Sequence, residues 1–204
     1  MNQNVKRHKW PSMQLATRKT EHLASYIAAL TNGWSTDSAR GQQAADEELQ
    51  RINADPDAFL AGMEDREARG PAIKLPDGSE VKRLPGITRW MWDGAFCGRI
   101  DLRWQDGTTS LPPHCLGHIG YSVVPWKQRQ GYATQALHDL LPEAWAIGLA
   151  FVEITTNPAN IASQRVIQAN GGVLHEEFVQ PPQFGSKPGL RFRIYGPQGE
   201  AGFK

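Results

Sequence analysis

The amino-acid sequence predicts a mixed α/β (α+β) fold in which helices pack on a sheet. Helical periodicity dominates the first third of the chain, and from Ile87 onward strands and helices follow in the order β-β-β-α-β-α-β-β. The chain has 204 residues, 40% hydrophobic and 21% charged, as in ordinary globular proteins. We therefore expect a single domain over residues 1–204, with an N-terminal arm and helices in 1–86 and the sheet in 87–195.

Charge and cysteine content exclude several classes of protein. Lysine and arginine number 22 and aspartate and glutamate 21, a net charge of +1 that argues against a nucleic-acid or anionic membrane partner. No apolar run approaches the ~20 residues of a membrane span, and no apolar segment follows the basic N-terminus, so we expect a cytoplasmic protein. Cys97 and Cys115 are too few for a zinc site or a disulfide framework, and no metal is expected.

The N-terminal part is expected to hold a strand or arm and three helices. Residues 1–19 are polar and basic. Leu23, Ile27 and Leu30 recur at helical spacing, which predicts a helix capped by Thr20 and ended by Gly33. Further helices are expected over 38–52 and over 56–63, the latter with a proline in its first turn. A Pro-Asp-Gly sequence then predicts a turn over residues 75–78.

A hairpin is predicted where the pattern changes. Residues 87–92 and 96–104 alternate as strands and are joined by Asp93-Gly94, a strong turn signal. Residues 118–124 read as a third strand, ended by Pro125. Tryptophans 90, 92 and 104 are expected in the core, with the wall of an amine pocket as the alternative.

The C-terminal part alternates helices and strands. The helix after residue 131 contains Pro142, where we expect a kink or a break because an interior proline costs roughly 3 kcal/mol. A strand over 151–156 precedes a helix over 159–168, which ends at Asn170-Gly-Gly. Residues 173–179 and 191–195 form a last hairpin.

One segment carries chemistry: the strand, short loop and helix start between Gly120 and Leu137. Such a loop presents backbone N–H groups that the helix cannot pair, and the helix dipole adds positive potential. Gly131 and Ala133 allow a ligand to approach the backbone closely. The segment is therefore interpreted as a cradle for a diphosphate, although a tightly packed helix start is the plainer alternative. It contains neither a Walker A loop nor a Gly-x-Gly-x-x-Gly fingerprint.

The same segment resembles the Gln/Arg-x-x-Gly-x-Gly/Ala signature of the GNAT superfamily of acyl-CoA-dependent N-acetyltransferases. Gln128-Arg-Gln-Gly-Tyr-Ala133 fits that signature, and Val123-x-Pro125 precedes it at the usual spacing. The strand, Asn160, helix and glycine order downstream is similar to the second half of the family, so the resemblance covers roughly 87–195. Gly-His-Ile-Gly-Tyr over 117–121 is similar to a group of bacterial predicted acetyltransferases.

The resemblance implies a mostly antiparallel central sheet of about six to seven strands, with helices on both faces. It also implies that strands 118–124 and 151–156 splay apart around acetyl-CoA, the acyl donor. Val123 would pair with pantetheine, the cradle would hold the pyrophosphate, and Asn160 and Ser163 would reach the cofactor, although Asn160 equally suits a helix cap. The cradle residues are Gln128, Arg129, Gln130, Gly131, Tyr132, Ala133 and Thr134.

The resemblance also implies a base that takes the amine proton. His118 stands where many relatives carry Glu and has the right titration range, but a buried structural histidine is the more common case. Glu153 is the second candidate. Many members place a Tyr acid seven residues after the position of Asn160, and here Ile167 occupies that place. Thiolate protonation must therefore come from another group or from solvent.

Two functions from different classes follow. The first is an N-acetyltransferase that moves an acetyl group from acetyl-CoA to a primary amine in a ternary complex, with the helices of 20–63 walling the acceptor side. The second is a non-catalytic acyl-CoA-binding or sensor module, which Ile167 favours. A nucleotide phosphotransferase is disfavoured, since Lys-Ser/Thr and paired acidic metal ligands are lacking. The acceptor is not specified, and a homodimer is left open.

Overall fold

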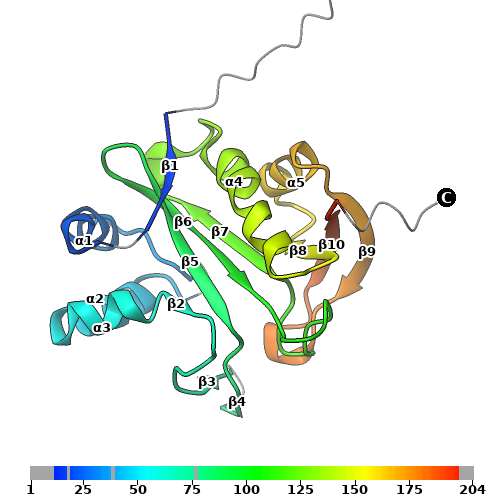
Figure 1. Cartoon of the computed structure of the whole chain (residues 1–204), viewed down its shortest axis with the longest axis horizontal. Coiled ribbons are helices and arrows are strands. Elements are labelled where there is room, and N and C mark those ends of the chain that lie inside the picture. The colour runs from blue at the N-terminus through cyan, green and yellow to red at the C-terminus, as the bar shows by residue number, and fades with distance from the viewer. Residues whose placement is uncertain (1–11, 18, 38–39, 76–77, 198–204) are drawn as a thin grey trace, which may run out of the picture.

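The computed structural model describes residues 12–17, 19–37, 40–75 and 78–197 and has a mixed α/β fold (Figure 1). Its strands form a five-stranded sheet in the order β1-β5-β6-β7, with β2 paired to β5, a three-stranded sheet in the order β8-β10-β9, and the small hairpin β3-β4. All of these pairings are antiparallel. The strands are β1 (Gln14–Ala16), β2 (Glu64–Asp65), β3 (Ile73–Lys74), β4 (Glu80–Val81), β5 (Gly86–Trp92), β6 (Phe96–Arg103), β7 (Ile119–Val123), β8 (Phe151–Thr156), β9 (Val173–Val179) and β10 (Pro188–Tyr195).

Both predicted hairpins are present. Strands β5 and β6 pair from Gly86↔Arg103 to Trp92↔Phe96, and Asp93-Gly94-Ala95 makes the turn. The last hairpin, β9 and β10, has the expected first strand, while its second strand starts at Pro188, three residues earlier than predicted. Strand β1 lies within the expected N-terminal arm, of which residues 1–11 are outside the described part. Residues 76–77 of the predicted turn are also outside it.

Helices α1 (Leu23–Thr31), α2 (Gln42–Ala54) and α3 (Pro56–Ala61) cover one face of the five-stranded sheet (Figure 1). Tyr26 on α1 stacks on Trp90 of β5, and both side chains are fully buried in the core between helices and sheet. Trp90 and Trp104 are core residues as expected, whereas Trp92 packs at the edge of this core.

Three helix starts differ from the prediction, and the last of them lies at Ile161 rather than residue 159, because Asn160 is the N-cap. Thr20 does not cap α1: it opens a 3-10 turn, Thr20–His22, that runs directly into the helix with no side-chain cap. The turn itself bonds His22 N–H to the Lys19 carbonyl, so no cap is needed there. Helix α2 starts at Gln42 rather than Ser38, because Gly41 has a φ of +51°, outside the helical region. Residues 38–39 themselves are not described.

Helices α4 (Tyr132–Ala146) and α5 (Ile161–Ala169) cover the opposite face (Figure 1). A kink or a break was expected at Pro142, and the break is wrong, because α4 is continuous through that residue. Leu141 and Ala144, on either side of the proline, are buried in the main core, while the Pro142 ring is exposed. Burial of the apolar stripe outweighs one lost hydrogen bond, and water can reach the carbonyl that the proline leaves unpaired.

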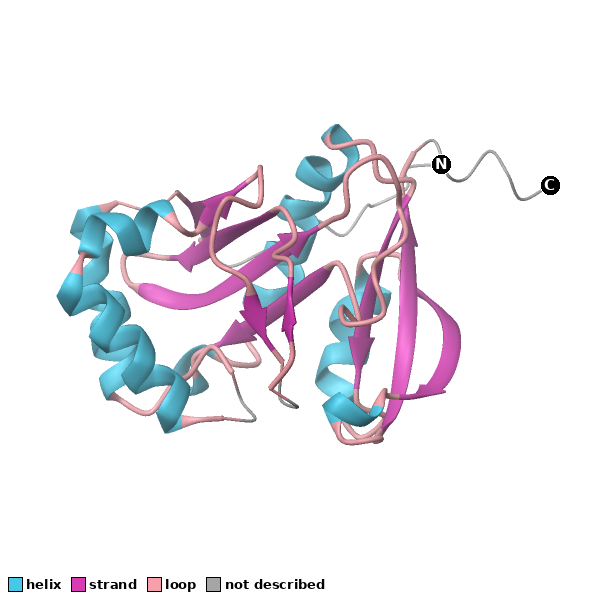
Figure 2. Cartoon of the chain, turned by 90° about the horizontal axis from the view of Figure 1, so that it is seen from below, coloured by secondary structure: helices cyan, strands magenta, loops and turns pink. Residues whose placement is uncertain are grey.

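The two sheets separate between β7 and β8, and Figure 2 shows them as distinct groups of strands. At the start of β7, His118 N–H donates to the Glu153 carbonyl of β8 at 2.7 Å. Beyond that point β7 pairs only with β6 and β8 only with β10 among the described strands. This is the splay that the sequence resemblance implies.

Candidate active site

The predicted cradle is the exposed loop between β7 and α4. Gln128 N–H donates to the Pro125 carbonyl and Gln135 N–H to the Gly131 carbonyl. Within the described chain, the backbone N–H groups of residues 129–134 have no hydrogen bond, as expected where a helix begins. Gly131 has a φ of +86°, which an L side chain rarely adopts, and this conformation turns the chain into the helix. The loop therefore presents a run of unpaired donors at a helix N-terminus, an arrangement that suits an anion.

Asp93 in the β5–β6 turn anchors this loop from the neighbouring hairpin. Its carboxylate accepts hydrogen bonds from Lys127 Nζ and from the Tyr132 hydroxyl, both at 2.6 Å. Burial alone would raise the pKa of Asp93, but these two donors outweigh it and lower the pKa to about 2. Sequence reasoning saw Asp93 only as a turn residue. It is a fixed anion that holds the residue before the cradle, Lys127, and Tyr132 within it.

Asn160 and Ser163 lie at the start of α5, close to β7. The Asn160 side chain accepts from Ser163 N–H at 3.0 Å, so the cap alternative for this residue is confirmed. The Ser163 hydroxyl is 2.8 Å from the Tyr121 hydroxyl of β7. Asn170 Nδ2 donates to the Thr134 carbonyl and so ties the end of α5 to the start of α4. The structure thus brings the two predicted cofactor segments onto one side of the sheet.

Val123 is the last residue of β7 and lies opposite Gly98 of β6. A Cβ at Gly98 would lie 2.3 Å from the Ser122 carbonyl, so only glycine permits this close approach. From the other face, Trp34 Nε1 donates to the Ser122 hydroxyl at 3.0 Å. These contacts hold the end of β7 rigidly, beside the cradle and at the open end of the splay.

His118 is buried at the closed end of the splay and is 1% exposed. Its Nδ1 accepts from Glu153 N–H at 2.9 Å, which leaves the proton on Nε2, 3.0 Å from the Thr109 carbonyl. Burial lowers the pKa of the imidazole. Both ring nitrogens are engaged in a neutral tautomer, a geometry that favours a structural role over that of a base.

Glu153, the second predicted base, forms an ion pair with Arg193 on the neighbouring strand β10. Its carboxylate accepts from Arg193 Nε and Nη2 at 2.9 and 2.8 Å, and Arg191 Nε lies 3.8 Å away. The Arg193 guanidinium also stacks over the Phe151 ring, 4.2 Å from its centroid. Glu153 is thus a charge-paired residue of β8 rather than an open carboxylate.

Tyr121 is a polar group on the side of the sheet that carries the predicted cradle, and no role in the site was predicted for it from the sequence. Burial raises the pKa of its hydroxyl to about 12, and the bond to Ser163 lowers it only in part. Ile167, where many relatives carry Tyr, is fully buried in the core. Strand alternation places Tyr121 on the same face as Val123, which was the signal available in the sequence.

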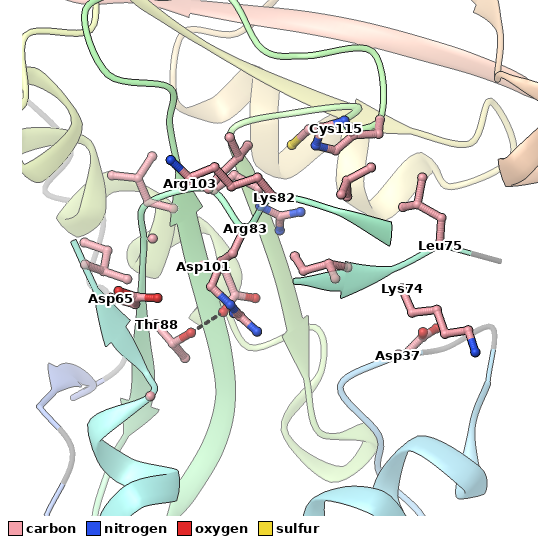
Figure 3. A pocket seen from close by; sticks show the side chains of 18 of the residues that line it. Asp37, Asp65, Lys74, Leu75, Lys82, Arg83, Thr88, Asp101, Arg103 and Cys115 are labelled. Atoms are coloured by element: carbon pink, nitrogen blue, oxygen red, sulfur yellow. Dashed lines mark hydrogen bonds between the residues drawn. The ribbon is translucent and has the colours of Figure 1, made fainter. Parts of the chain in front are cut away.

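A pocket of about 1030 Å³ opens on the other face of β5 and β6. Figure 3 shows Thr88 and Asp101 on its floor, joined by a hydrogen bond of 2.6 Å. The β3–β4 hairpin, residues 114–115, the 3-10 turn at residues 183–184 and residues 37, 40, 62, 63 and 65 also line it. In the hairpin region, only a turn over residues 75–78 was predicted from the sequence, since the contacts of these segments with the strands join residues distant along the chain. Among the described residues, no group of three or more His, Cys, Asp or Glu side chains could hold a metal ion.

In the parts of the chain that are described, no helix has the length and apolarity to cross a membrane. No curated protein matches the sequence significantly. Solved structures share the fold. RimL, a ribosomal L7/L12 alpha-N-protein acetyltransferase solved with coenzyme A, has 14% identity over 92% of this chain and 96% of its own, with a TM-score of 0.58. A chimera of spermidine N-acetyltransferase SpeG from Vibrio cholerae and hSSAT has 11% identity over 91% and 96%, with a TM-score of 0.58.

A third structure with the same fold is the microcin C7 self-immunity acetyltransferase MccE in complex with acetyl-CoA and AMP. It has 9% identity over 91% of this chain and 93% of its own, with a TM-score of 0.55. At these identities the likeness concerns the fold alone. The family model of the GNAT acetyltransferase domain, however, matches the sequence itself over residues 28–173, well over half of the chain. This protein therefore belongs to the GNAT family of acetyltransferases.

Proposed function

We propose that the protein is an N-acetyltransferase that transfers the acetyl group of acetyl-CoA to a primary amine by direct attack in a ternary complex. The run of unpaired N–H groups over residues 129–134, at the start of α4 and beside the splay, is the observation that carries this proposal. The acetyl-CoA in MccE and the coenzyme A in RimL support it, since both proteins share this fold. Acetyl-CoA would supply an activated thioester, and no metal is needed.

The cradle fits the pyrophosphate of this donor. The side chains of residues 128–130 are exposed, so the loop is open to a ligand, and Asp93 holds it through Lys127 and Tyr132. The backbone of Val123 is proposed to pair with the pantetheine. Ser163 is proposed to contact the donor through its hydroxyl, while the Asn160 side chain keeps its capping bond and acts by fixing the helix start. The proposed cradle residues are Gln128, Arg129, Gln130, Gly131, Tyr132, Ala133 and Thr134.

Proton transfer needs groups other than the two predicted bases. The ring nitrogens of His118 and the carboxylate of Glu153 are engaged, so water is proposed to carry the amine proton away. Tyr121 holds its proton at neutral pH because its pKa is about 12. Its position, beside Ser163 and on the same strand face as Val123, is what supports the proposal that it protonates the leaving thiolate, in place of the Tyr that many relatives carry where Ile167 stands.

A non-catalytic acyl-CoA-binding module is the second candidate. The observation that favours it is the burial of Ile167 where many relatives place an acid, together with the engaged state of His118 and Glu153. For either function we propose that residues 1–204 form one domain and that the protein acts in the cytoplasm. That it forms a homodimer stays a prediction.

Calorimetry with acetyl-CoA, followed by thiol release in the presence of an amine panel, separates these functions. The proposal expects binding and amine-dependent thiol release, with an acetylated amine found by mass spectrometry. Binding with no transfer to any amine would favour the sensor module. Absence of binding by the folded protein would contradict both.

A further inference from the structure

The pocket on the β5–β6 face is rich in positive charge. Six basic and three acidic side chains line it. Two acidic groups are already neutralised within the pocket: Asp37 pairs with Arg40 at 2.9 Å, and Asp101 pairs with Arg99 at 2.6 Å. In Figure 3, Lys82, Arg83 and Arg103 gather on one side of the pocket, and Lys74 projects from the hairpin. The pocket therefore has an excess of positive charge that its own acidic groups do not balance.

Arg103 is the member of this group that lies nearest the splay. It projects from β6 across β7, and its Nη2 lies 3.3 Å from where a Cβ at Gly120 would be. Within the described residues, the half-buried Arg103 guanidinium has no hydrogen bond or ion pair, unlike Arg99 and Arg40. Lys82 and Lys74 are exposed at the pocket rim. An unpaired guanidinium that lines a pocket is suited to a bidentate anion.

The extended backbone of β7 sets the distance between this guanidinium and the proposed site of transfer. Gly120 and Val123 are three residues apart on β7, which is about 10 Å at the rise of an extended strand. Gly120 lies beside the basic pocket, and Val123, which faces the opposite side of β7, lies where the thioester is proposed, so the acceptor would reach through the splay. An acceptor that reaches both must carry its amine and its anion about 10 Å apart.

We propose that the acceptor is an amine that also carries an anionic group, a carboxylate or a phosphate, and that Arg103 and Lys82 bind this anion. The inference rests on the proposed function and adds the substrate class. The same excess of charge repels polyamines, because like charges in a partly desolvated pocket disfavour binding. Arg103 and Lys82 are thus specificity-determining residues.

Competition among amines of equal length tests this proposal. Aminooctanoate, octylamine and diaminooctane differ only in the far end, which is anionic, neutral or cationic, and aminooctyl phosphate distinguishes phosphate from carboxylate. We expect kcat/KM to be about tenfold or more higher for an anionic amine than for octylamine, and lowest for the diamine. Aminobutyrate, in which the amine and the carboxylate are too close together to span about 10 Å, should lose most of this advantage.

Variants separate the pocket from the donor site. Arg103→Gln and Lys82→Gln should raise KM for the anionic amine about tenfold, leave octylamine within about threefold and leave acetyl-CoA affinity unchanged, while Arg103→Lys should recover part of the loss. Lys19→Gln, which removes an exposed charge outside the pocket lining, is the matched control. Equal use of the three amines, or a preference for the diamine, would overturn the inference and leave the acetyltransferase intact. Failure to acetylate any amine would instead contradict the proposed function.

Discussion

His118 and Glu153 exchange two hydrogen bonds across the point where β7 and β8 part. The backbone N–H of His118 donates to the Glu153 carbonyl at 2.7 Å, and the backbone N–H of Glu153 donates to the His118 ring at 2.9 Å. The imidazole thus accepts the Glu153 N–H in the position where a backbone carbonyl would accept it if the two strands stayed paired. This pair closes the splay at one end and leaves its other end, beside Val123, open.

Loss of this clamp, the pair of hydrogen bonds between His118 and Glu153, is expected to lower the stability of the protein. His118→Ala removes a buried ring and leaves Glu153 N–H and the Thr109 carbonyl without their partners, which should cost about 2–4 kcal/mol and lower Tm clearly. Thermal unfolding and kcat per folded molecule are the measurements, and kcat should change less than about fivefold. An exposed-site control is His175→Ala. A loss of kcat/KM of about 10²-fold at unchanged Tm would restore His118 as the base.

The same residue predicts a pH dependence of stability. Burial lowers the pKa of His118 from 6.5 in the folded state, so the unfolded chain takes up the proton first as pH falls. The contribution of His118 to the free energy of unfolding should therefore be complete above about pH 6.5. It should decrease as the pH falls from there to the lowered pKa of the folded state. Tm measured from about pH 7.5 to about pH 5 should decrease less steeply in His118→Ala than in the wild-type protein. Parallel curves would contradict this.

Gly131→Glu is expected to abolish acetyl-CoA binding. The new side chain would face the pyrophosphate with both bulk and like charge, at a residue whose φ is +86°. Gly148→Glu is a matched control, since Gly148 follows the other end of α4 with a φ of +93° and open space around a Cβ. Calorimetry should show binding by the control alone. Unchanged affinity in Gly131→Glu would remove the cradle hypothesis.

Neither cysteine should carry the acetyl group. Burial, followed by the hydrogen bond to Asp93, raises the pKa of Cys97 to about 12, so its thiol stays protonated. Cys97→Ala and Cys115→Ala should keep most of kcat, and double-reciprocal plots of initial rates should intersect, as in a ternary complex. An acetyl-thioester on Cys115 in the intact mass, with parallel plots, would indicate a two-step transfer instead.

Tyr121→Phe tests the proposed proton donor. The change removes the hydroxyl beside Ser163 and keeps the ring, so kcat should fall about 10–10²-fold while acetyl-CoA affinity stays nearly constant. An acceptor variant such as Arg103→Gln should show the opposite pattern, with KM altered and kcat little changed. If Tyr121→Phe retains full kcat, solvent protonates the thiolate and Tyr121 only packs.

The sequence alone determined the features that depend on neighbouring residues. The Asp93-Gly94 turn, the Asn160 cap and the start of α4 at Gly131 each follow from φ preferences and hydrogen bonds within a few residues. The GNAT signature falls in this class, because a diphosphate cradle is a local backbone device. The same local reasoning went wrong at Pro142, where the cost of the proline is local but the compensating burial comes from the whole core.

Tertiary structure decided what depends on residues far apart in the chain. The clamp joins His118 to Glu153, 35 residues further along the chain. Because both ring nitrogens of His118 are engaged, the geometry favours a structural role over that of a base. The basic pocket likewise needs β6, the β3–β4 hairpin and the 3-10 turn at residues 183–184 together. Residue types and spacing carry no information on which partner occupies a ring nitrogen or leaves a guanidinium unpaired. Those partners exist only once the sheets are assembled.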